Sequence, residues 1–210
     1  NAIYVFIGSA FLVSALISIL HALAYKGMTV FEGTVTNANL GTQLWLANQY
    51  ILAVSFVIAP FLIGRNPRRS IFMPLFGAYL ILILLSIFWW KNFPVAYVEG
   101  SGLTKFKDYS EYIVAIAFLF SAYLFLQKRK SLDSKVIGLF ALVAFLFSTS
   151  TVLFTFYVGV YGFFNLAGHL IRVATFYAIY LGVVELGWMK PYEFLYRNFK
   201  QGEANIWTTE

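Results

Sequence analysis

The sequence contains no cysteine and only two histidines among its 210 residues. Without cysteine the chain cannot form a disulfide, an iron–sulfur cluster or a thiolate metal site. Charged residues are also scarce, at 11%, against roughly 25% in an ordinary soluble domain. Polar sequence is confined to short connections and to residues 191–210, which is too little for a catalytic domain beside a membrane.

The sequence also lacks the motifs that commonly mark enzymes. It contains no phosphate-binding glycine loop, no HExxH, no nucleophile elbow and no pair of intramembrane carboxylates suited to acid and base catalysis. The inverted repeats with broken helices that are typical of secondary transporters are not evident either. We therefore expect a protein without catalytic activity.

Long apolar stretches dominate what is present. The chain is 60% hydrophobic with a mean hydropathy of +0.76, and six stretches are close to the roughly 20 residues that a helix needs to cross a bilayer. The sequence predicts an all-α membrane bundle of six transmembrane helices within residues 1–190, a short cytoplasmic tail at 191–210, and a multi-pass protein of the cell membrane. The predicted helices span residues 2–24, 43–63, 71–90, 109–126, 135–156 and 166–188.

The distribution of basic residues predicts the orientation of these helices. Of the 15 Lys and Arg residues, ten lie on the side of the two termini, four lie on the opposite side and one lies within a helix. Because cytoplasmic loops carry an excess of Lys and Arg, we expect both termini in the cytoplasm. The basic residues cluster at helix ends without forming a soluble basic face, so we expect membrane lipids and no nucleic acid as partners. The ten are Arg65, Arg68, Arg69, Lys128, Arg129, Lys130, Lys135, Lys190, Arg197 and Lys200, and the four are Lys26, Lys91, Lys105 and Lys107.

Both histidines lie within apolar stretches, where an ionisable group is costly and commonly marks a functional site. In the predicted topology, the first helix reaches His21 about one turn before its outer end, and the sixth reaches His169 within about its first turn. Two imidazoles at one depth on different helices could ligate a haem b. The alternatives are hydrogen bonds from each imidazole to a neighbouring helix, or binding of an organic ligand or a metal without haem.

Further polar and ionisable residues are expected at the same level, among them Gln43 at the outer start of the second helix. Glu111 and Lys107 lie four residues apart, which predicts a local ion pair or, alternatively, a Glu111 that turns inward to a histidine or a cationic ligand. Arg172 lies one turn from His169. Four alternatives are open for its guanidinium: an anion, a lipid headgroup, Glu111, or an extended conformation that reaches the outer surface.

The connection at residues 91–108, KNFPVAYVEGSGLTKFKD, is unusually rich for a helix connector. Pro94, Gly100 and Gly102 favour turns, and its apolar side chains could pack against the bundle. We expect an ordered cap over the outer polar residues rather than a flexible linker.

Five segments in register resemble the third class of membrane-associated sensor (MASE) domains. The resemblance runs in order along almost the whole chain and implies a sensory input module that commonly lies upstream of kinase, PAS or diguanylate cyclase domains. The segments are HALAYKGMTVF from residue 21, NANLGTQLWLANQYI from 37, FPVAYVEGSGLTKFKDYSEYI from 93, FTFYVGVYGFFNLAGHLIR from 154 and FYAIYLGVVELGWMKPYEFL from 176.

The resemblance also implies which residues recur in the family, and nearly all of them lie on the predicted outer side. These are His21, Tyr25, Lys26, Thr42, Gln43, Trp45, Gly102, Leu103, Thr104, Lys107, Glu111, Thr155, Tyr157, Gly168 and His169.

The chain departs from the family pattern at three positions. Ser18 stands where the resemblance implies an acidic residue, Gln49 where it implies an arginine and Thr151 where it implies a glutamate. The family also usually has a helix before the one that carries His21, and an output domain after the last helix. Both are missing, so we expect a truncated or shortened relative.

The leading hypothesis is a non-catalytic sensory or ligand-binding domain with a polar pocket in the outer leaflet, which reports on an unknown small molecule to cytoplasmic signalling domains or partners. The alternatives are a haem b-binding electron-transfer subunit ligated by His21 and His169, and an accessory or scaffold subunit of a larger membrane complex. No metal-ligand set is assigned apart from His21 and His169 for a haem, and the cofactor is otherwise unknown. The predicted ligand-binding residues are His21, Tyr25, Lys26, Gln43, Trp45, Lys107, Glu111, Tyr157, His169 and Arg172.

Overall fold

The computed structural model describes residues 2–24, 28, 38–65, 67–129, 134–156 and 162–183. Six helices in this part of the chain are long and apolar enough to cross a membrane. The prediction of an all-α bundle of six membrane-spanning helices is therefore confirmed. The helices are α1 (Ala2–Leu23), α2 (Ala38–Ile58), α3 (Phe72–Leu84), α4 (Lys105–Gln127), α5 (Ser134–Thr155) and α6 (Phe163–Tyr180).

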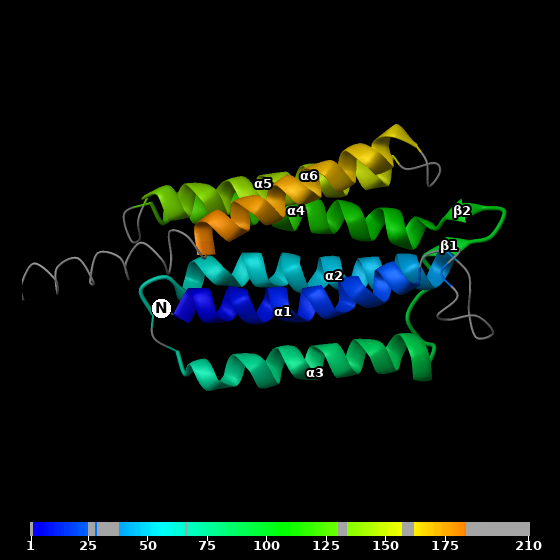
Figure 1. Cartoon of the computed structure of the whole chain (residues 1–210), viewed down its shortest axis with the longest axis horizontal. Coiled ribbons are helices and arrows are strands. Elements are labelled where there is room, and N and C mark those ends of the chain that lie inside the picture. The colour runs from blue at the N-terminus through cyan, green and yellow to red at the C-terminus, as the bar shows by residue number, and fades with distance from the viewer. Residues whose placement is uncertain are drawn as a thin grey trace, which may run out of the picture.

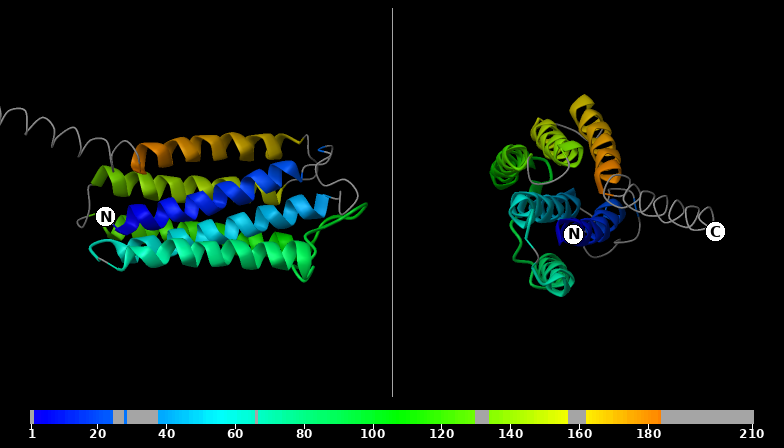
Figure 2. Two further views of the ribbon diagram at one scale, coloured as in Figure 1. Left: turned by 60° about the horizontal axis from the view of Figure 1, so that its bottom comes forward. Right: turned by 90° about the vertical axis from the view of Figure 1, so that its left-hand side faces the viewer.

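The helices lie roughly side by side and alternate in direction along the chain (Figure 1). The paired helices α1 and α2 occupy the middle of the bundle, with α4, α5 and α6 on one side and α3 on the other (Figure 2). We call the end where α1, α3 and α5 finish and α2, α4 and α6 begin the hairpin end. The first described residue and the end of α6 lie together at the opposite end (Figure 1).

Several helices extend beyond the hydropathy windows because polar residues form their first turns. The second helix begins at Ala38 instead of residue 43, so Thr42 and Gln43 lie inside it. The fourth begins at Lys105 instead of residue 109, since the Thr104 hydroxyl accepts a hydrogen bond from the Lys107 amide and caps the helix. The second helix also ends earlier than predicted and continues as a 3₁₀ turn, η2 (Ala59–Leu62), whose Pro60 cannot donate an α-helical hydrogen bond.

The span that contains α3 has irregular ends. A 3₁₀ turn, η3 (Arg69–Ile71), precedes the helix, and a π-helical turn, η4 (Leu85–Trp89), follows it. Together they make one apolar span from Arg69 to Trp89. This span is the least covered of the six by the rest of the protein, so most of its side chains are left to face lipid.

The long connection between α3 and α4 is ordered, as the sequence predicts. Its strands β1 (Tyr97–Val98) and β2 (Gly102–Leu103) form an antiparallel hairpin, with Gly100 and Gly102 at positive φ. The side chain of Asn39 on α2 accepts hydrogen bonds from the Ala96 and Tyr97 amides, at 2.8 and 3.0 Å. Gln43 donates its Nε2 to the carbonyls of Phe93 and Pro94, each at 3.0 Å. The first two turns of α2 therefore fix the loop against the bundle.

Aromatic side chains fill much of the core. Phe56 of α2 packs against Phe118 of α4 and Phe147 of α5 at ring-centroid distances of 5.9 and 5.6 Å. All three rings are fully buried. Phe11 of α1 contacts Phe176 of α6 at 6.3 Å, so α1 and α6 meet beside this core. The high phenylalanine content therefore serves packing in the middle of the bundle.

Candidate functional site

The indole of Trp45, in the second turn of α2, contacts side chains from three other helices near the hairpin end. The ring of Phe154 on α5 lies 4.7 Å from it between centroids, His21 on α1 lies 5.7 Å away and His169 on α6 lies 6.4 Å away. The guanidinium carbon of Arg172, also on α6, lies 4.8 Å from the ring centroid. We call these five residues the Trp45 cluster. It joins four helices at one level of the bundle.

The two histidines are therefore close to one site but differ in their surroundings. His21 is partly buried, and its Nδ1 lies 2.8 Å from the carbonyl oxygen of Gly41 on α2. A neutral imidazole that donates from Nδ1 to this carbonyl leaves Nε2 for another partner. His169 is exposed and packs its ring against Phe154 at 4.9 Å. Both imidazoles contact the same indole.

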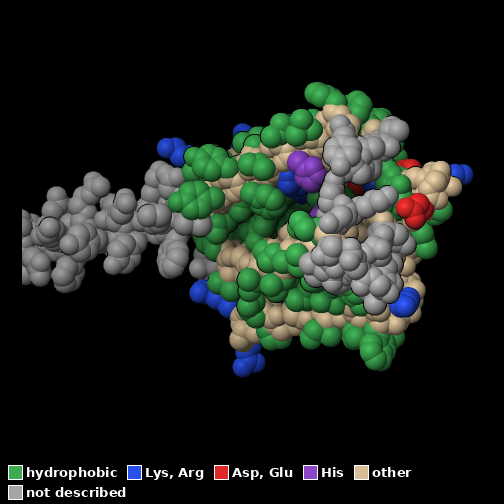
Figure 3. All heavy atoms as spheres, turned by 45° about the vertical axis from the view of Figure 1, so that its right-hand side comes forward, with side chains coloured by type: hydrophobic (Ala, Val, Ile, Leu, Met, Phe, Trp, Pro, Cys, Tyr) green, Lys and Arg blue, Asp and Glu red, His purple; other side chains and the backbone are tan. Residues whose placement is uncertain are grey.

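A space-filling view shows the outside of this region. Histidine side chains lie next to a basic side chain at the edge of a hollow that hydrophobic side chains surround (Figure 3). The histidines of the Trp45 cluster therefore lie beside a hollow on this face of the molecule.

Glu111 on α4 contacts the Trp45 cluster through the Trp45 indole and is completely buried. Its Oε1 accepts a hydrogen bond from Trp45 Nε1, and its Oε2 accepts one from Thr155, each at 3.2 Å. Oε2 also pairs with the ammonium group of Lys107, which is only 3% exposed and donates to the Phe154 carbonyl at 2.7 Å. The predicted ion pair is present, and Glu111 also turns inward. These two charges neutralise each other inside the bundle.

Arg172 is also buried, with 6% of its surface exposed. It donates from Nη2 to the side-chain oxygen of Gln49 at 2.6 Å. Its guanidinium carbon lies 4.8 Å from the ring centroid of Trp45 and 4.6 Å from that of Phe147. The suggestion that Arg172 extends to the outer surface is wrong, because the side chain is enclosed between α2 and α5. Among the described residues, the direct partners of the Glu111 carboxylate are Lys107, Trp45 and Thr155, and the direct hydrogen-bond partner of Arg172 is Gln49.

Gln49 holds the orientation of this guanidinium. Its Nε2 donates to the hydroxyl of Thr151 on α5 at 2.8 Å, and that hydroxyl donates to the Phe147 carbonyl of its own helix. The amide oxygen of Gln49 is thereby turned toward Arg172. Gln49 and Thr151 are two of the three positions at which the resemblance implied a charged residue, and the structure places them in direct contact.

The Arg172 side chain has more hydrogen-bond donors than acceptors around it. Among the described residues, neither Nε nor Nη1 of Arg172 has a hydrogen-bond partner. These two nitrogens carry three N–H groups. The guanidinium therefore has two aromatic neighbours, and three of its N–H groups have no acceptor in the part of the chain that the structure describes.

Some of the predicted site residues have other roles or other places. Gln43 holds the hairpin connection through two carbonyls and does not reach the Trp45 cluster in the hydrogen bonds described above. Tyr25, Lys26 and Tyr157 lie outside the described residues, as does the tail at 191–210. The structure brings together His21, Trp45, Lys107, Glu111, His169 and Arg172.

The sequence did not single out the aromatic partners or the close contact between α5 and α6. Phe147 and Phe154 were not distinguishable from the other phenylalanines by type or spacing. Gly168 carried a signal as a family residue, and the structure gives its reason: a Cβ there would lie 2.7 Å from Cζ of Phe154. Gly168 therefore allows Phe154 to lie against α6 and beside Trp45.

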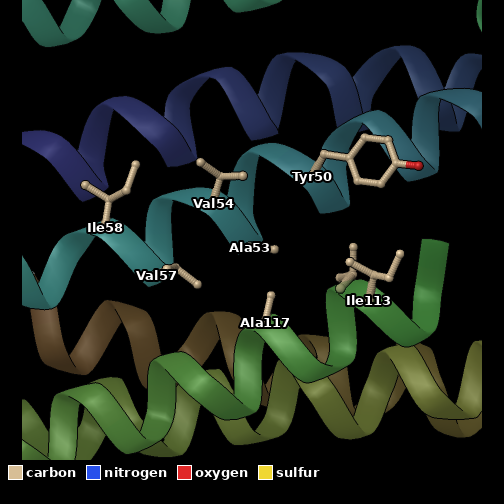
Figure 4. Close-up of a pocket in the computed structure, with 8 residues that line it drawn as sticks. Tyr50, Ala53, Val54, Val57, Ile58, Ile113 and Ala117 are labelled. Atoms are coloured by element: carbon tan, nitrogen blue, oxygen red, sulfur yellow. The ribbon is translucent and has the colours of Figure 1, made fainter. Parts of the chain in front are cut away.

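A separate groove lies between α2 and α4, with a volume of about 230 Å³ (Figure 4). Its polar group, the Tyr50 hydroxyl, already donates to Ser110 at 2.7 Å. Such a groove offers a ligand no polar anchor and suits an acyl chain of the bilayer. It is lined by Tyr50, Ala53, Val54, Val57, Ile58, Ile113, Val114 and Ala117.

Comparison with known families agrees with this architecture. The family model MASE3, described as a membrane-associated sensor domain, matches residues 1–191. The chain belongs to the MASE3 family. The resemblance seen in the sequence segments is thus confirmed, and the MASE3 domain is a multi-pass membrane protein of sensory type. No curated protein and no solved structure matches the chain. Sensor domains of this kind are typically non-catalytic.

Proposed function

We propose that this MASE3 domain is a non-catalytic ligand sensor, that the Trp45 cluster is its binding site, and that α6 carries the ligand state along the membrane. The hairpin end would face outward and the tail at 191–210 would lie in the cytoplasm, next to signalling domains or partner proteins. The observation that carries the proposal is that one indole joins α1, α2, α5 and α6 through His21, Phe154, His169 and Arg172.

The packing of α6 supports its role as the moving element. Along its length α6 packs on α5, and it reaches α2 through the side chains of Arg172 and His169. A helix that is held on one side by polar and ring contacts can shift when those contacts change. A ligand produces such a shift only if it binds the two helix arrangements with different affinity. A group that replaces or adds to the contacts of Arg172 would satisfy this requirement.

The absence of cysteine makes this proposal directly measurable. Cysteines introduced at Ile58 on α2 and Tyr180 on α6, which are 40% and 49% exposed, would be the sole sites for spin labels. We expect pulsed electron–electron double resonance in lipid nanodiscs to show two populations of the distance between the two spin labels. His169→Ala should change their ratio by about twofold or more, because it removes contacts with Trp45 and Phe154.

The matched control is Leu170→Ala on the same helix. Leu170 is 61% exposed and is not part of the Trp45 cluster, so its removal should leave the ratio unchanged. A single distance that is identical in the wild type and in His169→Ala would contradict the proposed transmission through α6.

A further inference from the structure

The charges enclosed near the hairpin end do not balance. Lys107 and Glu111 form a pair, and Arg172 adds a second cation whose one hydrogen-bond acceptor among the described residues is the neutral amide oxygen of Gln49. An ionised group in the hydrocarbon layer is costly unless it is paired or reaches water. Among the described residues, the enclosed site therefore has one positive charge more than it has negative charges.

The surroundings of Arg172 orient it rather than neutralise it. Trp45 and Phe147 both lie within cation–π distance of the guanidinium carbon, and Gln49, which Thr151 holds in place, accepts a hydrogen bond from Nη2. Cation–π contacts attract the charge of a guanidinium but do not supply an anionic oxygen acceptor for its N–H groups. The donors of Nε and Nη1 are thus held in fixed directions without acceptors among the described residues. Fixed donors bind an anion without a further cost of ordering.

Arg172 itself is enclosed, but its neighbour on α6 reaches the surface. His169, one turn away on α6, is exposed and shares the Trp45 ring with it. The hollow seen in the space-filling view lies beside histidine and basic side chains and has a hydrophobic surround (Figure 3). Phe11 and Phe176 line the meeting of α1 and α6 further along the bundle. The polar region around His169 and Arg172 is thus continuous with a hydrophobic region between α1 and α6.

We propose that the Arg172 guanidinium, in contact with Trp45 and Phe147 and next to His169, binds the anionic oxygen group of the ligand, a carboxylate or a phosphate. This inference rests on the proposed sensor function and adds the chemical class of the ligand. The anion would accept hydrogen bonds from Nε or Nη1 and supply the missing negative charge. The group could belong to an amphipathic molecule that enters from the membrane or to a small free anion, and the two sources are separable by experiment.

Thermal unfolding in a neutral detergent tests the proposal with four probes: decanoate, its neutral counterpart decanol, acetate and inorganic phosphate. We expect decanoate to raise the Tm of the wild type in a saturable manner and decanol to leave it unchanged. Arg172→Gln should require about tenfold more decanoate, or more, for the same shift, because it removes a charge-assisted hydrogen bond. Arg68→Gln, which removes an exposed arginine at the other end of the bundle, should respond as the wild type does.

The outcomes separate the sources of the anion. A shift with acetate or phosphate as well as decanoate would support the anion site and assign it to free anions, whereas a shift with decanoate alone would assign it to an amphipathic anion. Equal shifts with decanol and decanoate, equal responses of Arg172→Gln and the wild type, or no shift with any of the three anions would overturn the proposal. In each of these cases the distance measurement on α2 and α6 would still decide the sensor function separately.

A second measurement uses the unaltered chain in case Arg172→Gln does not fold. A decanoate analogue with a photoreactive diazirine should label peptides of α1 and α6, and decanoate should compete with it while decanol should not. If acetate or phosphate also competes, the site accepts free anions. Labelling confined to other helices, or equal competition by decanol, would overturn the proposal.

Discussion

Arg172 on α6 donates a hydrogen bond of 2.6 Å to the side-chain oxygen of Gln49 on α2. The same amide of Gln49 donates to Thr151 on α5, so one side chain connects three helices at a depth where water is scarce. Inside a bilayer each polar group must find its partner within the protein. The contact therefore fixes the position of α6 and the orientation of its buried cation at the same time.

Gln49→Leu should destabilise the bundle more than an ordinary polar substitution. It would remove the acceptor of a buried guanidinium and a partner of Thr151, and leaving a buried polar group unsatisfied costs about 1–3 kcal/mol, with charged groups above that range. Equilibrium unfolding in mixed micelles would measure the loss. Thr149→Val is the control, because the Thr149 hydroxyl bonds to the Phe145 carbonyl of its own helix. A free energy of unfolding within about 0.5 kcal/mol of the wild type would show that Gln49 does not support Arg172.

Glu111→Gln should cost about 3–5 kcal/mol in the free energy of unfolding, because it leaves the buried ammonium of Lys107 without its counter-charge. The double variant Lys107→Met with Glu111→Gln should cost less than the two single variants together, since both buried charges then disappear. A double-mutant cycle measures this coupling. Strictly additive effects would mean that the pair does not act as a unit.

Gly168→Ala should separate α5 from α6 or displace Phe154. The added Cβ would lie 2.7 Å from Cζ of Phe154, which is a severe overlap in a packed interior. Overpacking of this kind commonly costs about 1–3 kcal/mol, and the same change should alter the environment of Trp45. Gly77→Ala on α3 is the matched control, because nothing lies within 4 Å of its added Cβ. It should be neutral or stabilising by up to about 1 kcal/mol.

Purified protein from haem-sufficient cells should show no Soret band. A bis-histidine haem requires both imidazoles to meet one iron across a flat macrocycle. The Trp45 indole contacts both rings, at 5.7 Å from His21 and 6.4 Å from His169, so both imidazoles already pack against a protein side chain. A Soret band that disappears in His21→Ala or His169→Ala would contradict this expectation and restore the haem alternative.

The sequence predicted the helices well because their signal is simple. A helix satisfies its backbone hydrogen bonds internally, and its side chains must be apolar where they face lipid. Long apolar stretches therefore identify the membrane-spanning helices. Errors lie at helix starts, where polar residues such as those from Ala38 to Gln43 form helical turns that hydropathy does not detect. A further error lies at the end of the second helix, where a 3₁₀ turn with Pro60 replaces the last predicted turn. The order of the hairpin connection was also predictable, from its length, turn residues and apolar side chains.

The sequence predicted the position of the candidate site along the bundle but not the contacts between its side chains. Histidine, glutamate and arginine are rare enough in apolar sequence to stand out, and topology placed them near one end. Arg172 donates its hydrogen bond to Gln49 and not to Glu111. Which of the two it contacts depends on the rotation of α6 about its axis and on which helices are neighbours. Hydropathy carries little information about either, because lipid-facing and protein-facing positions are both apolar. In the sequence, Gln49 and Thr151 stood out only as neutral residues where the resemblance implied charged ones. Nothing in the sequence indicated that the two side chains are in contact.

A density map of the wild-type protein in lipid nanodiscs, at a resolution that defines side chains, tests the central claim most directly. The account predicts a non-protein density beside the Trp45 cluster, with an atom within about 3 Å of Arg172 Nε or Nη1 and a shape that fits an anionic group. If protein groups or isolated water molecules fully satisfy the guanidinium and no such density is present, the proposal that Arg172 binds the ligand is contradicted.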